Sequence, residues 1–257
     1  MKAKVAVISD IHANADALTV ALKKIHSAAV DLTIVLGDVL TYGCQPLEVI
    51  NLLKKYNKEN AVIFIKGNHD QFYFDLQSDS NNGSYSLPKF VEESISWTMN
   101  KIASFKLEEI FTWQDSYYLG DVYFSHANPF NYGDWSYIED LENLQKAFQI
   151  LNDKKVFSGV FGHSHRQIFI GNKNGVLHEM KEYRPSDNMN QLIINTGSIG
   201  QPRGGGLGYV VIEFQDDKLI NASFKQIKIN LSKSIGLIKR AGFSYETEAK
   251  LIGYLEG

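Results

Sequence analysis

The residues of this chain that could do chemistry stand in short motifs, each directly after an apolar run. The motifs are Asp10-Ile11-His12, Gly37-Asp38, Gly67-Asn68-His69-Asp70, His126 and Gly162-His163-Ser164-His165. The chain has seven histidines, and all except His26 and His178 fall in these motifs. A single histidine at a turn is usually an ordinary hydrogen-bonded residue. The other five, beside Asp10 and Asp38, indicate a metal site.

The types of these residues narrow the choice of metal. Mixed carboxylate, imidazole and amide ligands suit Mn²⁺, Fe²⁺, Zn²⁺ or Co²⁺, of which Mn²⁺ is the favoured candidate. Cys44 is the single cysteine, so a structural zinc site is excluded, and the imidazoles are too many for a Ca²⁺ or Mg²⁺ cage. The ligands exceed what one ion needs, so we expect two ions about 3.5–4 Å apart that share one carboxylate. Such a pair would supply a bridging hydroxide as nucleophile and neutralise phosphoryl oxygens.

Apolar runs predict the elements that must position these motifs. Strands at 5–8, 32–36 and 61–65, with helical repeats between them, predict a βαβαβ unit and a parallel sheet. Ligands bind at the carboxyl ends of such strands, so Asp10, Asp38 and Asn68 are expected to meet there. Later strands are predicted with mostly short links, which indicates a more antiparallel half, at 117–119, 122–124, 156–161, 168–170, 176–183, 192–195, 209–214 and 219–229.

The length of 257 residues allows one large domain or two small ones. We expect a single α/β domain over residues 1–257. The segment at about 71–115 is predicted to form a helical insert over one edge of the sheet. Two short helical patterns separated by Gly242 predict C-terminal helices at about 233–256.

Composition excludes several classes of function. The hydrophobic content of 44% and the charged content of 21% are those of a soluble globular protein. A net charge of −3 argues against a general nucleic-acid or membrane surface. No stretch approaches the ~18 apolar residues of a membrane span, and no signal-peptide pattern is present. We therefore expect a cytoplasmic protein, and the oligomeric state stays open.

Taken in order, the motifs resemble those of the calcineurin-like metallophosphoesterases. Residues 10–14 and 195–203 look like the small bacterial and archaeal phosphodiesterase-type branch. The resemblance implies a four-layer α/β/β/α sandwich with mixed sheets. It also implies a first metal bound by Asp10, His12, Asp38 and His165, and a second bound by Asp38, Asn68, His126 and His163.

Further roles follow from the same resemblance. His69 would lie near the leaving group as a hydrogen-bond donor or general acid, and Asp70 would orient it and stabilise its charge. Asn68 and Arg203 would bind substrate, with Arg203 next to three glycines that allow close approach to a ligand. Two alternatives stay open: Asp70 as a helix-start residue, and Arg203 as a surface ion-pairing residue.

One departure from the family pattern bears on the substrate. The family's protein Ser/Thr phosphatases carry Asp-Arg where this chain has Thr41-Tyr42, and that Arg clamps the phosphate. Without this Arg, binding of a dianionic monoester is weakened more than binding of a monoanionic diester. We therefore expect a phosphodiesterase acting on a small phosphate ester, with nucleotide-like esters among the candidates. The alternatives are a phosphomonoesterase, a dinucleoside polyphosphate hydrolase or a non-catalytic binding module on the same fold. The aromatic residues at 130–137 could stack on a substrate base or pack in the core.

Overall fold

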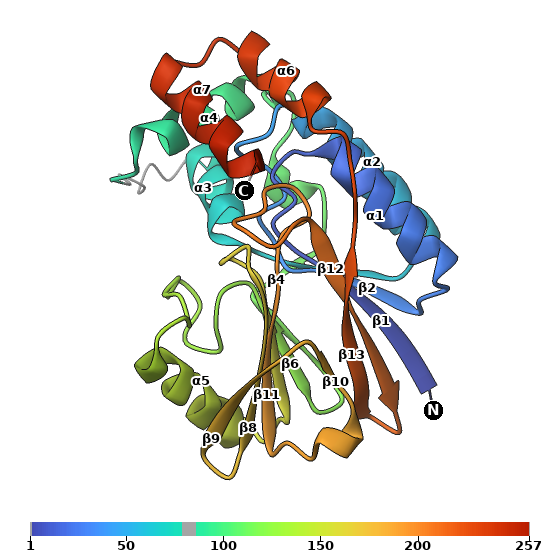
Figure 1. Ribbon diagram of the computed structural model, residues 1–257. Helices are drawn as coiled ribbons and strands as arrows, with labels where there is room; N and C mark the ends of the chain where they lie inside the picture. The colour runs from blue at the N-terminus through green and yellow to red at the C-terminus, as the bar shows by residue number, and fades with distance from the viewer. Residues whose placement is uncertain (1, 79–85, 257) are drawn as a thin grey trace.

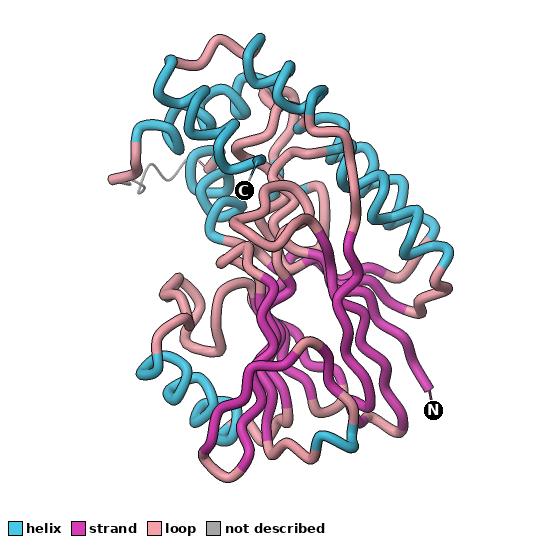
Figure 2. Tube along the Cα trace, in the orientation of Figure 1, coloured by secondary structure: helices cyan, strands magenta, loops and turns pink. Residues whose placement is uncertain are grey.

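The apolar strands of the sequence pair into two sheets that pack face to face (Figure 1). The computed structural model describes residues 2–78 and 86–256. One sheet has seven strands in the order β10-β13-β12-β1-β2-β3-β4, and the other has six in the order β5-β6-β7-β11-β8-β9. Helices lie on the outer sides of this pair of sheets, as Figure 2 shows by colour.

The seven-stranded sheet consists of β1 (Lys2–Ile8), β2 (Leu32–Val35), β3 (Val62–Ile65), β4 (Trp113–Gln114), β10 (Glu182–Tyr183), β12 (Gly208–Gln215) and β13 (Lys218–Gln226). The six-stranded sheet consists of β5 (Ser116–Leu119), β6 (Val122–Ser125), β7 (Ser158–Phe161), β8 (Gln167–Lys173), β9 (Val176–Met180) and β11 (Gln191–Thr196). Strands β1 to β4 are parallel, as are β6, β7 and β11, whereas β5, β8, β9, β10, β12 and β13 pair antiparallel. The predicted parallel beginning and more antiparallel remainder are therefore present.

The helices are α1 (Ala15–Ser27), α2 (Pro46–Glu59), α3 (Asn68–Gln77), α4 (Lys89–Lys101), α5 (Leu141–Asp153), α6 (Ser232–Arg240) and α7 (Tyr245–Glu256), with short 3₁₀ helices at Leu107–Glu109 and Pro185–Asp187. Pro46 stands at the first position of α2, where its missing N–H costs nothing. Among the described residues, no helix is both long and apolar enough to cross a bilayer.

Alternation along the strands divides the interior into three apolar cores. Ala6 and Ile8 of β1 pack with the helices on one face, whereas Val5 and Val7 pack against the opposite sheet. A third core, which includes Phe148 of α5, lies on the outer face of the six-stranded sheet. Three cores separate four layers, so the fold is the expected α/β/β/α sandwich with mixed sheets.

Two strands differ from the expectation. The strand predicted at 176–183 is divided, because β9 pairs with β8 in one sheet and β10 pairs with β13 in the other. The segment at 71–115, expected to form a helical insert, contains α4 and also contributes β4, which lies parallel to β3. Residues 79–85 of that segment lie outside the described part of the chain. Elements this short depend on a partner strand, and nothing in their own sequence predicts them.

The C-terminal helices pack over the helical segment. The indole N–H of Trp97 in α4 donates to the carbonyl of Ala241 at 3.0 Å, and Ser244 Oγ donates to Glu93 Oε1 at 2.8 Å. These contacts bring α7 beside α4, on the side of the molecule that holds the strand ends described next (Figure 1).

Candidate metal centre

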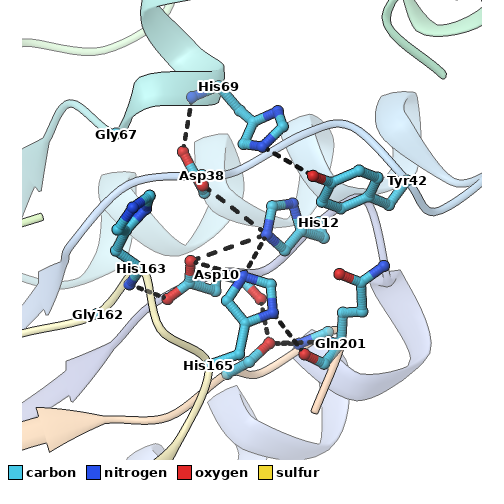
Figure 3. A network of polar contacts seen from close by, with 12 residues as sticks. Asp10, His12, Asp38, Tyr42, Gly67, His69, Gly162, His163, His165 and Gln201 are labelled. Carbon is cyan, nitrogen blue, oxygen red and sulfur yellow. Dashed lines mark hydrogen bonds and ion pairs between the residues drawn. The ribbon is translucent and has the colours of Figure 1, made fainter. Parts of the chain in front are cut away.

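The predicted ligands lie at the carboxyl ends of strands from both sheets. Asp10 and His12 follow β1, Asp38 follows β2, Asn68 and His69 begin α3 after β3, His126 follows β6, and His163 and His165 follow β7. Because the two sheets pack face to face, these ends converge on one place (Figure 3). The predicted ligands are buried except for Asn68, which is half-buried.

The ligand atoms form two groups. In each group the ligand atoms lie within 4.8 Å of one another: Asp10, His12 and His165 in the first, and Asp38, His126 and His163 in the second. Asp38 Oδ2 lies 3.4 Å from His126 Nε2 and 3.8 Å from His12 Nε2, so this carboxylate faces both groups. Asn68 Oδ1 lies 3.1 Å from His126 Nε2, beside the second group.

A backbone carbonyl orients each of the four histidines. The bonded pairs are His12 Nδ1 with Leu40 O at 3.0 Å, His126 Nδ1 with Leu36 O at 2.6 Å, His163 Nε2 with Trp135 O at 2.9 Å and His165 Nδ1 with Gln201 O at 2.7 Å. A carbonyl only accepts, so the ring nitrogen facing it carries the hydrogen. In a neutral imidazole the other nitrogen then presents a lone pair, which is the arrangement found around bound metals.

These lone pairs face other acceptors. His12 Nε2 and His165 Nε2 are 3.0 Å apart, and Asp10 Oδ1 lies 3.2 Å from His165 Nε2. Asp10 Oδ1 is buried and has no hydrogen-bond partner among the described residues. Acceptors that face one another repel, whereas a divalent cation attracts all of them. The donor set therefore fits divalent transition-metal ions.

Burial keeps several of these imidazoles neutral. It lowers the pKa of His163 to about 3 and that of His69 to about 4. Burial would raise the pKa of Asp38, but His126 and His69 outweigh it and hold the pKa of this carboxyl well below its usual range. Burial opposes the charged form of His126 as well, yet the Asp38 carboxylate raises the pKa of His126 to about 9. Asp38 is therefore a carboxylate, and His126 is the neighbour that its charge affects most.

The backbone of the ligand loops is unusual. Asp10, His12, Asp38, His163 and His165 have φ between 45° and 65°, in the left-handed region. Non-glycine residues rarely adopt this region, although Asp and His do so more often than most. Such conformations persist only where the surroundings hold them, and they concentrate at functional sites.

Glycine is required in two of the motifs by close contact. A Cβ on Gly67 would overlap the Asp38 side chain, and a Cβ on Gly162 would overlap Ser9 Oγ and lie 2.7 Å from Asp10 Oδ2. Both loops can therefore approach the ligand carboxylates only without a side chain at these positions. In return, the backbone N–H of His163 donates to Asp10 Oδ2 at 2.9 Å.

Asp70 binds backbone donors of the loops that carry Asp38 and Gly67. Its Oδ2 accepts from the backbone N–H groups of Asp38 at 2.7 Å and Gly67 at 2.9 Å, and its Oδ1 accepts from that of Val39 at 3.1 Å. No hydrogen bond joins Asp70 to His69 among the described residues, and the expectation that Asp70 orients His69 stays a prediction. Burial and the Asp38 charge raise the pKa of Asp70 to about 7, whereas the N–H donors favour its ionised form.

His69 is held by a residue for which the sequence indicated no contact. His69 Nε2 lies 3.1 Å from the hydroxyl oxygen of Tyr42 (Figure 3). The backbone N–H of His69 donates to Asp38 Oδ1 at 2.9 Å, which places its ring next to the ligand groups. Tyr42 and His69 are 27 positions apart, and no local motif joins them.

Arg203 lies among tyrosines, one of which stacks on a histidine of the second ligand group. Its guanidinium donates to Tyr137 Oη at 3.4 Å and stands 5.2 Å from the ring centre of Tyr254 in α7. The Tyr137 ring stacks on His163, with centroids 4.6 Å apart and planes 16° from parallel. Arg203 is therefore close to the ligands, and the C-terminal helix reaches this place through Tyr254.

The sequence has relatives among known proteins. Residues 3–194 match the calcineurin-like phosphoesterase family. The chain belongs to this family. The uncharacterized protein MJ0912 of Methanocaldococcus jannaschii is 31% identical over 232 residues, which cover 85% of this chain and 86% of that protein.

Solved structures share the fold of this phosphoesterase. A metallophosphoesterase from Sphaerobacter thermophilus aligns with a TM-score of 0.75 at 22% identity, covering 99% of this chain and 100% of the other. The hypothetical protein PH1004 from Pyrococcus horikoshii OT3 aligns with a TM-score of 0.77 at 19% identity, covering 99% and 98%. At these identities the likeness concerns the fold.

Membership in the family decides between the classes left open by the sequence. The phosphoesterase is an enzyme that hydrolyses phosphoric esters, and the two buried ligand groups agree with the family's use of divalent metals. A non-catalytic binding module is therefore set aside.

Two parts of the site were missed by the sequence analysis of this phosphoesterase. The carbonyls that orient the histidines have no sequence signature, because every residue carries one. Tyr254 approaches Arg203 from a helix about fifty residues further along the chain, so only the fold brings them together. The aromatic segment at 130–137 contributes the Trp135 carbonyl and the Tyr137 ring to the surroundings of His163.

Proposed function

We propose that this phosphoesterase is a phosphodiesterase that works with two divalent metal ions, Mn²⁺ being the favoured candidate. Asp10, His12, Asp38 and His165 would hold one ion, and Asp38, Asn68, His126 and His163 the other. The observation that carries the proposal is the position of Asp38 Oδ2, which lies 3.8 Å from His12 Nε2 in one group and 3.4 Å from His126 Nε2 in the other. Two ions held by these residues would lower the pKa of a bound water and would neutralise phosphoryl oxygens.

The remaining residues of the site would handle the substrate. Arg203 would bind a phosphoryl oxygen, since its guanidinium is a permanent cation. Asn68 would donate its amide N–H to the substrate while its oxygen faces His126. His69 would lie beside the leaving oxygen and supply a hydrogen bond or a proton. The substrate class that fits is a small phosphodiester, with nucleotide-like esters among the candidates.

The preference for a diester is supported by Tyr42. Burial raises the pKa of its hydroxyl, so Tyr42 is neutral at the position where the family's protein phosphatases carry an Arg. A monoester carries a second negative charge that such an Arg would bind. A diester lacks this second charge, so the one cation of Arg203 suffices for it and a neutral Tyr42 weakens its binding less.

Hydrolysis of bis-p-nitrophenyl phosphate and p-nitrophenyl phosphate in the presence of Mn²⁺ tests this proposal. We expect faster turnover of the bis ester, and a loss of about a thousandfold in kcat in Asp38→Asn. Asp153→Asn, which changes an exposed carboxylate at the end of α5, is the matched control and should behave as wild type. Absence of turnover with Mn²⁺, Fe²⁺, Zn²⁺ and Co²⁺, or a preference for the monoester, would contradict the proposal. Metal analysis should find two ions per wild-type chain and fewer in Asp38→Asn.

A further inference from the structure

We propose that Tyr42 is a positioning residue for His69, an inference that rests on the function proposed above. The Tyr42 hydroxyl lies 3.1 Å from His69 Nε2, and the two residues are only 5% and 6% exposed. His69 Nδ1 is buried and lacks a hydrogen-bond partner in the part of the chain that is described. Among the described residues the His69 ring makes a side-chain hydrogen bond with Tyr42 and none with Asp70, so Tyr42 is the side chain that fixes the orientation of the imidazole (Figure 3).

Tyr42 lies in a strained turn, which places its hydroxyl against His69. Thr41 and Tyr42 have φ of 73° and 65°, a region that is exceptional for β-branched and bulky residues. The backbone N–H of Gly43 donates to the carbonyl of Thr41 at 2.8 Å, which closes a γ-turn around Tyr42. Turns of this kind are rare, and they persist only where the surrounding structure imposes them.

The helical segment after β3 imposes this turn. The backbone N–H of Tyr42 donates to Ser94 Oγ in α4 at 2.6 Å. Thr41 Oγ1 and Tyr73 Oη in α3 share a hydrogen bond of 2.7 Å. Both bonds are buried, so water does not compete for them. One function of this segment is therefore to hold Tyr42 against His69.

The hydrogen bond should control the leaving-group step more than binding. The His69 ring lies edge-on to His12, with centroids 5.3 Å apart and planes 89° apart, and it contacts Phe72 edge-on at 5.3 Å. These ring contacts would keep His69 in place without Tyr42 Oη, but the imidazole could then turn about its last side-chain torsion, which has a broad energy well. With the Tyr42 hydroxyl donating to Nε2, the hydrogen of the neutral imidazole stands on Nδ1, and a leaving oxygen that needs a hydrogen bond from Nδ1–H would suffer from this freedom. A phenolate that leaves without one would not.

The test compares wild type with Tyr42→Phe on methyl aryl phosphate diesters whose leaving phenols span a range of pKa. At saturating Mn²⁺ we expect kcat of Tyr42→Phe to fall about tenfold or more for the poorest leaving group and less than about threefold for p-nitrophenol. KM and the half-saturating Mn²⁺ concentration should stay within about twofold, because the hydroxyl bonds to His69 and, in the described part of the chain, to no predicted metal ligand. Tyr56→Phe removes another buried hydroxyl, bonded to Thr33 far from the site, and should match wild type.

A double-mutant cycle with His69→Asn separates positioning from a structural effect. If Tyr42 acts through His69, the double variant should be no slower than His69→Asn alone. Additive losses, or a loss in Tyr42→Phe that is equal for all leaving groups, would overturn the proposal. Ser94→Ala removes the bond that holds the turn but keeps the Tyr42 hydroxyl, and it should show a weaker form of the same leaving-group dependence. This variant serves as the test if Tyr42→Phe does not fold. Should wild type hydrolyse only monoesters, the proposed diester preference fails, and the same comparison on aryl monoesters still tests Tyr42.

Discussion

Replacing Asp70 by Asn distinguishes the role found for this residue from the role implied by the family resemblance. The carboxylate accepts three backbone N–H groups, from Asp38, Gly67 and Val39, at 2.7, 2.9 and 3.1 Å. It therefore ties the loop after β2 to the beginning of α3. If this is its function, Asp70→Asn should reduce stability and leave the leaving-group dependence of kcat unchanged.

The size of the effect follows from the three bonds. In Asp70→Asn the amide oxygen can still accept from Asp38 and Gly67, but the amide N–H₂ would then face the N–H of Val39, donor against donor. Losing one bond to a charged acceptor costs about 1.5–3 kcal/mol, and weakening two others to neutral bonds costs about 1 kcal/mol each. Relief of the repulsion between Asp70 and Asp38 offsets part of this loss. We expect the free energy of unfolding to fall by about 2–4 kcal/mol, which lowers Tm by roughly 4–16 °C in a chain of this size.

Thermal unfolding followed by circular dichroism, with and without Mn²⁺, measures the change in stability. The series of methyl aryl phosphates measures the kinetic effect, and Asp153→Asn controls for the loss of an exposed carboxylate. A Tm within about 2 °C of wild type, together with the leaving-group dependence of His69→Asn, would refute the structural role and restore Asp70 as the partner of His69.

The other predictions concern the metals, Arg203 and Cys44. Chelation with EDTA should abolish hydrolysis, and activity that survives chelation would exclude a metal requirement. Restoring metal at a hundred times its Kd should recover activity and stabilise the fold by about 2.7 kcal/mol for each ion bound, measured by kinetics and thermal unfolding. Arg203→Lys should raise KM about tenfold with kcat within about threefold, because Lys cannot form the two parallel bonds of a guanidinium; an unchanged KM would place Arg203 outside the substrate site. Burial raises the pKa of the Cys44 thiol from 9.0 to about 12. Alkylation of Cys44 in the folded protein at pH 8 should therefore be about a thousandfold slower than alkylation of a free thiol, and denaturation should remove the difference. Rapid alkylation of the folded protein would show an accessible thiolate.

The ligand residues could be proposed from the sequence because their positions follow from simple rules. Asp10, Asp38 and Asn68 directly follow apolar runs, and parallel strands place their carboxyl ends at one edge of a sheet. His126 and His163 follow strands of the second sheet, and the structure brings them to the same place. The pairing of the two sheets is the step that residue patterns alone did not supply, and it came from the family resemblance.

The roles of Asp70 and Tyr42 could not be predicted in the same way. Asp70 stands at the third position of α3 and accepts from the N–H of Gly67, as a helix-start residue does, so the alternative left open for it was closer to its role. Its bonds to Asp38 and Val39 depend on the loop after β2, more than thirty residues earlier. Tyr42 adopts a left-handed backbone that its residue type disfavours, so local propensity argues against the conformation that gives it a function.

The loop between Asp38 and Tyr42 joins the carboxylate that faces both ligand groups to the hydrogen-bond partner of His69. At its beginning, Asp70 holds the backbone of Asp38, the carboxylate that faces both ligand groups. At its end, Ser94 and Tyr73 hold the turn that carries Tyr42. Strain of about 1–3 kcal/mol per left-handed residue favours relaxation of this loop, and the buried hydrogen bonds at its two ends oppose it. Because the buried hydrogen bonds at the two ends act on different residues, we expect loosening the Asp70 end to affect stability and the position of Asp38, and loosening the Ser94 end to affect leaving-group protonation through Tyr42.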